Sequence, residues 1–240
     1  MSRTLFLAAN WKMHSAPEGT FDPESPYKIQ DSVDVVVFST FLDLAACLQV
    51  GIEAGPQYGH AEASGPHTGD VSLKMCADLG CTYALCGHSD RRQKHGETDD
   101  MVAAQVKAAL ALRLHPVVCI GEKEEERDAG KQQEVVRRQM SVLPLEQNIT
   151  IAYEPIWAIS RGDPNKPAAS TQDAQEMHAF IRSLLPDATR ETMRLLYGGS
   201  MKPENAKELL SQPDIDGGLI GGASLKPDAF REIITIAQSL

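Results

Sequence analysis

The stretch ITIAYEPIWAI, residues 149 to 159, ends a run of branched apolar residues with a carboxylate and a proline. Branched apolar residues favour extended backbone, and Pro155 restricts the residue before it to the extended region. The stretch therefore predicts a buried strand that places Glu154 at its C-terminal end. A carboxylate there can be a cap, an ion-pair partner or a catalytic base, and the rest of the sequence has to decide among these roles.

Seven other runs of the chain have the same apolar, branched character. They are TLFLAAN (4–10), VDVVVFS (33–39), QVGIEAG (49–55), TYALCG (82–87), PVVCIG (116–121), MRLLYGG (193–199) and DGGLIGG (216–222). Most are separated by segments with helical periodicity, such as the one that places Val102, Val106 and Ala109 on one face. Because strands that alternate with helices pair in parallel, eight such units predict a single (β/α)8 barrel over residues 1–240 rather than an open doubly wound sheet.

The segment SAPEGTFDPESPYKIQDS, residues 15–32, stands where the first helix of such a barrel belongs. It holds three prolines and a glycine and shows no apolar periodicity. Internal prolines remove helix hydrogen bonds and clash with the preceding turn. We therefore expect a shortened or irregular first helix, with a loop in most of its place.

Composition excludes several classes of protein. The formal charge of −10 argues against a nucleic-acid or anionic-membrane surface, and no apolar run is long enough to span a bilayer. The five cysteines form no CxxC pair, and LFLAA is too short for a signal peptide, so we expect a cytoplasmic protein. We expect no metal or cofactor, because the remaining histidines show no metal-ligand spacing: His14, His60, His67, His95, His115 and His178.

Polar residues with chemical potential follow the predicted strands. In a parallel barrel the C-terminal ends of the strands share one face, so these residues converge although they are distant in sequence. Asn10 and Lys12 follow the first strand, His88 the fourth and Glu154 the sixth, while YGGS and IGGAS end the last two. Singly, each is an ordinary surface charge or tight turn. Together they supply a cation, an electrophile, a base and a phosphate cradle.

Six motifs in this order and spacing resemble the triosephosphate isomerase family, over nearly the whole chain from Asn10 to Phe230. They are AANWKMH (8–14), CGHSDRR (86–92), PVVCIGE (116–122), AYEPIWAI (152–159), LYGGS (196–200) and DGGLIGGASLKPDAF (216–230). The resemblance implies a (β/α)8 barrel, a homodimer and the interconversion of D-glyceraldehyde 3-phosphate and dihydroxyacetone phosphate through an enediolate, without a cofactor. Two alternatives are an isomerase of a longer ketose phosphate, such as L-erythrulose 1-phosphate, and a non-catalytic phosphosugar-binding barrel.

The resemblance also assigns roles at the reacting carbons. Glu154 would be the base, and Asn10 would donate a hydrogen bond to the substrate oxygens. Lys12 would offset the negative charge of the phosphate and of the developing oxyanion. His88 would polarise the carbonyl as a neutral imidazole at the start of a short helix over residues 89–92, with a lowered pKa, as is established for this family.

The phosphate would bind to backbone N–H groups at Ser160, Ser200, Gly221 and Gly222, because backbone without Cβ obstruction can approach an anion closely. Resemblance places a lid directly after Glu154, with Pro155, Ile156 and Trp157 as its first hinge, whose closure excludes water. The polar loop EASGPHTGDVS, residues 62–72, would enter the neighbouring subunit, with Thr68 at the family's threonine.

Four departures from the family pattern concern the lid and the support of Lys12. Ser160 replaces a glycine, Arg161 adds a charge at the lid tip, and the lid's far side, to Ala169, is about four residues longer. Asp90 stands where the family has a longer glutamate, so either its side chain fails to reach Lys12 or the backbone compensates. Glu97 matches the family and is expected to support the site.

Overall fold

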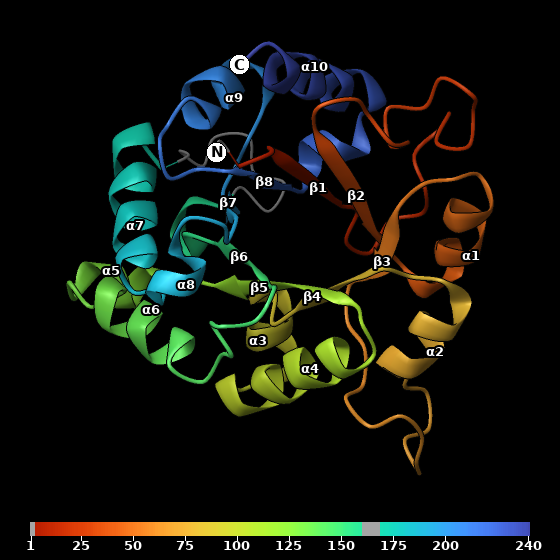
Figure 1. The fold of residues 1–240 in the computed structure, drawn as a ribbon, viewed down its shortest axis with the longest axis horizontal. Helices are drawn as coiled ribbons and strands as arrows, with labels where there is room; N and C mark the ends of the chain where they lie inside the picture. The colour runs from red at the N-terminus through yellow and green to blue at the C-terminus, as the bar shows by residue number, and fades with distance from the viewer. Residues whose placement is uncertain (1–2, 160–168) are drawn as a thin grey trace.

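Eight parallel strands form a nearly closed barrel surrounded by helices (Figure 1). The protein is described by a computed structural model that covers residues 3–159 and 169–240. In the described part of the chain the strands are β1 (Phe6–Asn10), β2 (Asp34–Ser39), β3 (Ala54–Pro56), β4 (Tyr83–Cys86), β5 (His115–Ile120), β6 (Thr150–Tyr153), β7 (Leu195–Tyr197) and β8 (Gly217–Ile220). This arrangement confirms the (β/α)8 barrel.

The strand order is β3-β2-β1-β8-β7-β6-β5-β4, so the first and last strands of the chain are neighbours. In their register Phe6 lies opposite Gly217, and Ala9 opposite Ile220. The barrel closes where β3 meets β4. A Cβ on Gly55 would lie 2.3 Å from the carbonyl oxygen of Tyr83, so only glycine allows the two backbones to approach this closely.

The third strand is shorter and later than predicted. We expected it over residues 49–55, whereas it covers Ala54–Pro56, because Gln49 is the last residue of a helix and Gly51 forms the turn after it. The helices are α1 (Phe41–Gln49), α2 (Leu73–Leu79), α3 (Ser89–His95), α4 (Asp99–Ala111), α5 (Glu124–Asp128), α6 (Gln132–Met140), α7 (Thr171–Ser183), α8 (Asp187–Arg190), α9 (Pro203–Leu210) and α10 (Pro227–Gln238), with short 3-10 turns η1 (Ile156–Ala158) and η2 (Gly222–Leu225).

Side chains alternate along each strand between the barrel interior and the helix layer. The interior holds Phe6, Ala8, Val36, Phe38, Leu85, Val117, Cys119, Ala152, Leu196 and Leu219. The intervening residues, such as Leu7 and Ala9, pack under the helices. Both faces are therefore buried, which explains why the strands read as continuous apolar runs. None of the helices in the described ranges combines the length and the apolar character needed to cross a bilayer.

No helix forms between β1 and β2 among the described residues, as the prolines predicted. The loop instead inserts Tyr27 into the helix layer, where its ring is fully buried. The ring stacks on Phe230 of α10 at 5.2 Å and meets Trp11 edge-on at 5.2 Å. Its hydroxyl donates a hydrogen bond to the carbonyl of Ser224 at 2.7 Å. A rearranged loop thus fills the place of the missing helix.

Candidate active site

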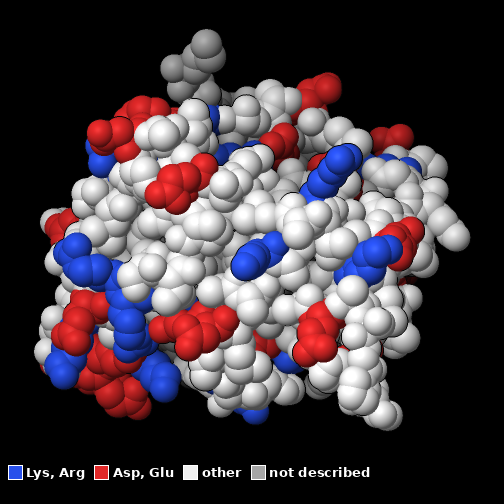
Figure 2. Space-filling view, turned by 60° about the horizontal axis from the view of Figure 1, so that its bottom comes forward, with Lys and Arg blue, Asp and Glu red and all other residues white. Residues whose placement is uncertain are grey.

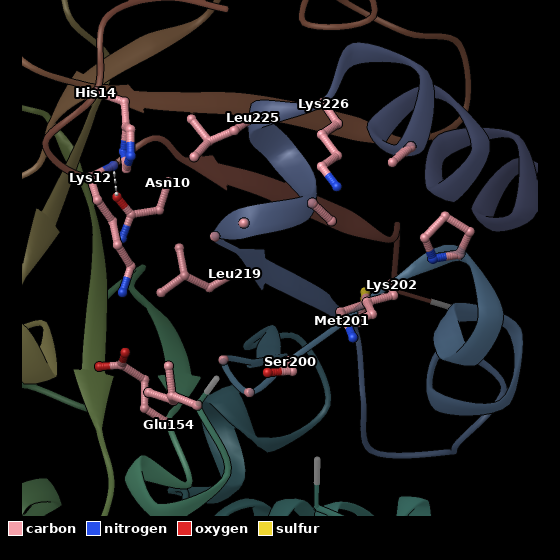
Figure 3. Close-up of a pocket in the computed structure, with 18 of the residues that line it drawn as sticks. Asn10, Lys12, His14, Glu154, Ser200, Met201, Lys202, Leu219, Leu225 and Lys226 are labelled. Atoms are coloured by element: carbon pink, nitrogen blue, oxygen red, sulfur yellow. Dashed lines mark hydrogen bonds between the residues drawn. The ribbon is translucent and has the colours of Figure 1, made fainter. Parts of the chain in front are cut away.

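A cavity of about 810 Å³ opens at the C-terminal ends of the strands (Figure 3). Its lining includes most of the site residues predicted from the sequence: Asn10, Lys12, His88, Asp90, Glu154, Ser200, Gly221 and Gly222. Glu97 does not line it, and Ser160 and Arg161 lie outside the described residues. The barrel therefore brings together residues separated by more than 200 positions.

Lys12 adopts a left-handed backbone conformation, with φ of 52°, which is uncommon for a residue with a side chain. Two side chains hold it there. Asn10 Oδ1 accepts a hydrogen bond from the Lys12 amide at 3.0 Å, and Gln57 Nε2 donates to the Lys12 carbonyl at 2.7 Å. Gln57 also donates to the carbonyl of Phe38 at 2.9 Å. These bonds offset a backbone cost of about 1–2 kcal/mol and aim the lysine across the cavity.

Asp90 reaches Lys12 despite its short side chain. The Lys12 Nζ donates to Asp90 Oδ2 at 3.0 Å. Burial by itself would raise the pKa of Asp90, but the charge and hydrogen bond of Lys12 hold that pKa below its ordinary value. The carboxylate is therefore ionised at neutral pH and fixes the direction of the ammonium group.

His88 caps the N-terminus of α3 with its own ring. Its Nδ1 accepts a hydrogen bond from the Asp90 amide at 3.1 Å, so this nitrogen carries a lone pair and the proton of the neutral ring lies on Nε2. The Nε2 atom lies 3.0 Å from Glu154 Oε1. His88 therefore has the position and the tautomer of a neutral hydrogen-bond donor that faces the cavity.

The carboxylate of Glu154 is almost fully buried, with 2% of the residue exposed. Its Oε2 accepts a hydrogen bond from the Ser89 amide at 2.9 Å, and its Oε1 accepts one from the Ser89 hydroxyl at 3.1 Å. The N-terminus of α3 thus satisfies a charge that would be costly to bury alone. Gly198 leaves room for it, because a Cβ there would lie 2.8 Å from Glu154 Cγ.

The predicted phosphate cradle lies at the ends of β7 and β8. A Cβ on Gly222 would meet nothing within 4 Å, and one on Gly221 would lie 3.5 Å from Lys12 Cε. Gly222 therefore borders open space, and Gly221 lies next to the side chain of Lys12. Asn205 donates to the Ser200 carbonyl at 3.0 Å and so supports the neighbouring turn.

The residues directly after Glu154 are anchored by a second carboxylate, Glu122. It is fully buried and accepts hydrogen bonds from the Tyr153 hydroxyl at 3.0 Å and from Trp157 Nε1 at 2.8 Å. Burial raises the pKa of Glu122, while these donors act in the opposite direction. The guanidinium of Arg127 lies 3.8 Å from the centre of the Trp157 ring. The residues of the predicted first hinge are thus anchored, whereas residues 160–168 of the predicted lid lie outside the described ranges.

Glu97 stands behind the site rather than in it. Its Oε1 accepts a hydrogen bond from Arg91 of α3 at 2.7 Å, and Arg91 in turn stacks on the ring of Tyr58 at 3.8 Å. These contacts position the helix that carries His88 and Asp90.

Sequence reasoning missed Gln57, the hydrogen bonds of Ser89 and the space provided by Gly198. Gln57 carried no local signal, because its partner Lys12 lies 45 positions away. Ser89 was recognised only as a helix start, and Gly198 only as part of a tight turn.

Comparison with known proteins gives a consistent result. A family model described as triosephosphate isomerase matches residues 5–237. A protein of Rhodopirellula baltica named triosephosphate isomerase is 44% identical over 262 residues, covering 100% of both chains. Relatives of the same name from Herpetosiphon aurantiacus and Hydrogenovibrio crunogenus are each 44% identical and cover 97% and 99% of this chain and 98% of their own.

Proposed function

The chain belongs to the triosephosphate isomerase family, and we propose that Glu154, His88 and Lys12 carry out its interconversion of triose phosphates through an enediolate. The protein is an isomerase, so the alternative of a non-catalytic binding barrel is set aside. The two substrates are D-glyceraldehyde 3-phosphate and dihydroxyacetone phosphate.

Proton transfer is assigned to Glu154. Its carboxylate takes a proton from the carbon beside the substrate carbonyl and returns it to the former carbonyl carbon, while the hydroxyl proton of the first carbon passes to the former carbonyl oxygen. Ketose and aldose are thereby exchanged with no change in overall composition. The intermediate carries negative charge on oxygen. The Nε2–H of His88 donates a hydrogen bond to that oxygen, and a neutral ring is well matched to the acidity of an enediol.

Charge stabilisation is assigned to Lys12 and the glycine turns. A Cβ on Gly221 would lie 3.5 Å from Lys12 Cε, so the lysine side chain runs beside the proposed phosphate cradle. We assign the substrate phosphate to the backbone at Ser200, Gly221 and Gly222, and to Ser160 when the lid closes. Asn10 donates through its amide nitrogen, because its oxygen is already bonded to the Lys12 amide.

One observation carries this proposal: Glu154 Oε1 and His88 Nε2 lie 3.0 Å apart in the cavity that Lys12 also lines. A base and a donor this close can act on adjacent atoms of one small substrate.

Replacement of Glu154 by Gln tests it. The change keeps the shape and removes the base, so we expect kcat to fall by at least about 1000-fold. A coupled assay measures turnover, and exchange of the carbon-bound proton with solvent measures proton abstraction. Binding of a phosphorylated inhibitor should persist. Glu124, exposed on α5, supplies the matched control Glu124→Gln, with unchanged turnover. Full proton exchange in Glu154→Gln would rule out the assigned base.

The size of the cavity leaves room for a larger substrate. At about 810 Å³ it lies in the upper part of the range for small-ligand sites, and it continues past the cradle to Leu225, Lys226 and Glu232. A four-carbon ketose phosphate such as L-erythrulose 1-phosphate is therefore a candidate alternative. The ratio of kcat/KM for L-erythrulose 1-phosphate to kcat/KM for D-glyceraldehyde 3-phosphate decides between the four-carbon and the three-carbon substrate.

We also propose a cytoplasmic homodimer with one catalytic domain per chain over residues 1–240. The loop 62–72, which contains Thr68, extends away from the barrel after β3 (Figure 1). Met13 and Leu42 follow the adjacent strands β1 and β2 and are 91% and 92% exposed. Exposed apolar side chains at the same end of the barrel as a protruding loop support an interface there. The five buried free thiols suit a reducing compartment.

A nucleic-acid or anionic-membrane partner is not proposed. On the face drawn in Figure 2, basic and acidic side chains are interspersed, which is consistent with the formal charge of −10.

A further inference from the structure

The loop between β3 and α2, residues 57–72, is closed at its base by backbone hydrogen bonds. His60 donates its amide to the carbonyl of Val71 at 2.8 Å, and its own carbonyl accepts from the Leu73 amide at 3.0 Å. Near the tip, Asp70 donates its amide to the carbonyl of His67 at 3.0 Å. Residues at the two ends of this loop are therefore held opposite each other although the loop itself is exposed.

Three side chains with metal-binding atoms meet across this loop. One donor atom from each of His60, Glu62 and His67 lies within 4.8 Å of the other two. The two imidazole rings lie 4.0 Å apart with an interplanar angle of 30°, and His67 Nε2 lies 3.3 Å from Glu62 Oε2. The spacing in sequence gave no indication of this cluster, because loop closure rather than helical or strand periodicity brings its members together.

Each ring nitrogen of His60 faces a group of the same loop. Its Nδ1 accepts a hydrogen bond from the Glu62 amide at 3.1 Å, so the lone pair of this nitrogen points toward the Glu62 backbone. The opposite nitrogen, Nε2, faces Asp70 Oδ2 at 4.0 Å. A metal-binding histidine usually donates its second ring nitrogen to a carboxylate, and the carboxylate of Asp70, at 4.0 Å, would have to approach further to accept that bond. A metal ion at Nδ1 would release the Glu62 amide to solvent.

His67 supplies a second, independent indication. Its Nε2 is shielded from solvent and makes no hydrogen bond within the described part of the chain, in spite of its nearness to Glu62. Gly65 allows this position, because a Cβ there would lie 2.8 Å from His67 Cδ2 and 2.9 Å from Nε2. The His67 side chain is 31% exposed, but its Nε2 atom is shielded and has bonding capacity that a metal ion would satisfy.

We propose that this loop binds a divalent transition-metal ion, with Zn²⁺ as the best match, through His60, Glu62 and His67. Two imidazoles, one carboxylate and a water molecule make a common four-coordinate zinc site. Ligand atoms at about 2.1 Å from Zn²⁺ lie about 3.4 Å apart in a tetrahedron, so the cluster has to contract. Glu62 can make that movement, since its side chain is 65% exposed.

The proposed ion would join the beginning of the loop to its middle. It is independent of the isomerase reaction, because none of its three ligands lines the cavity that contains Glu154. Its expected effect is structural: the loop assigned above to the dimer interface would lose conformational freedom when the ion binds, and the folded protein would gain thermal stability.

The first experiment titrates Co²⁺, a spectroscopic substitute for Zn²⁺, into the chelator-treated full-length protein at neutral pH. We expect one ion per chain, with visible absorption bands of a four-coordinate nitrogen and oxygen site, and displacement by Zn²⁺. Intense thiolate bands would assign the ion to cysteine and overturn the proposal. Absence of saturable binding would overturn it as well.

Variants locate the site. His67→Asn and Glu62→Gln should each weaken Zn²⁺ binding by at least about tenfold in calorimetry. Gly65→Ala keeps all three ligands but displaces the His67 ring, so it should weaken binding too. The control is His95→Gln, an exposed histidine on α3, which should bind like the wild type. Equal affinity in His67→Asn and the wild type would refute the assignment.

Discussion

Asn10 shows how one side chain serves two purposes at the residue scale. Its oxygen holds the Lys12 amide, and this bond stabilises a left-handed backbone that directs the lysine across the cavity. Its amide nitrogen is the group assigned to the substrate. Loss of Asn10 would therefore affect both the substrate contact and the position of the cation.

The pair of Lys12 and Asp90 gives a prediction that depends on pH. Asp90→Asn keeps the size of the side chain and removes its charge. Because the pair is partly exposed, we expect kcat/KM for triose phosphate to fall only about three- to tenfold. The lowered pKa of Asp90 means that its ionised form stabilises the folded state above the ordinary value of 3.8. This contribution disappears as the pH falls through the lowered folded-state pKa.

Urea denaturation at several pH values measures the contribution of ionised Asp90 to the free energy of unfolding. The free energy of unfolding of the wild type should exceed that of Asp90→Asn at pH 7, and the difference should shrink below pH 3.8. A constant difference would show that the charge of Asp90 is not its source. Kinetics of Asp90→Glu, which restores a longer carboxylate, should match the wild type within about threefold if reach is not limiting.

The sequence predicted most of the residues that line the cavity, because the C-terminal ends of parallel strands must share one face. It did not predict whether Asp90 reaches Lys12. That contact depends on the left-handed backbone at Lys12, which Gln57 stabilises from 45 positions away. Contacts between side chains that are distant in sequence are set by packing, and local patterns do not record them.

At the scale of elements, the segment between β1 and β2 shows how a loop can replace a helix. The prolines correctly predicted that no regular helix forms there. They did not reveal that Tyr27 would stack on Phe230 and bond to Ser224. The boundaries of β3 were wrong for a related reason, since a branched apolar residue such as Val50 fits the end of a helix as well as a strand.

Tyr27→Phe tests the loop as part of the core. The variant leaves the buried Ser224 carbonyl without its donor and should lower the free energy of unfolding by about 1–2 kcal/mol. Tyr27→Ala opens a cavity and should cost about 3–5 kcal/mol. Ile29→Ala, at an exposed position of the same loop, should change stability by less than about 0.5 kcal/mol. Denaturant titration measures all three, and equal values for the three variants would exclude a core role for Tyr27.

For the whole molecule, the proposed dimer predicts a light-scattering mass twice that of the 26.1 kDa chain. Met13→Glu and Leu42→Glu would bury a charge in the interface, so each should raise the dissociation constant of the dimer by at least about tenfold. Val142→Glu, after α6 at the opposite end of the barrel, is the control and should remain dimeric. A monomeric wild type with full activity would contradict the dimer.

The pairing of β1 with β8 has a consequence for how the chain is made. Phe6 and Gly217 are neighbours in the sheet but are separated by 211 positions. During synthesis at about 5–20 residues per second, one edge of β1 waits about 10–40 seconds for its partner strand. The emerging chain therefore exposes an apolar strand edge until almost all of it has left the ribosome, which makes the unfinished barrel a substrate for chaperones and its premature release a route to aggregation.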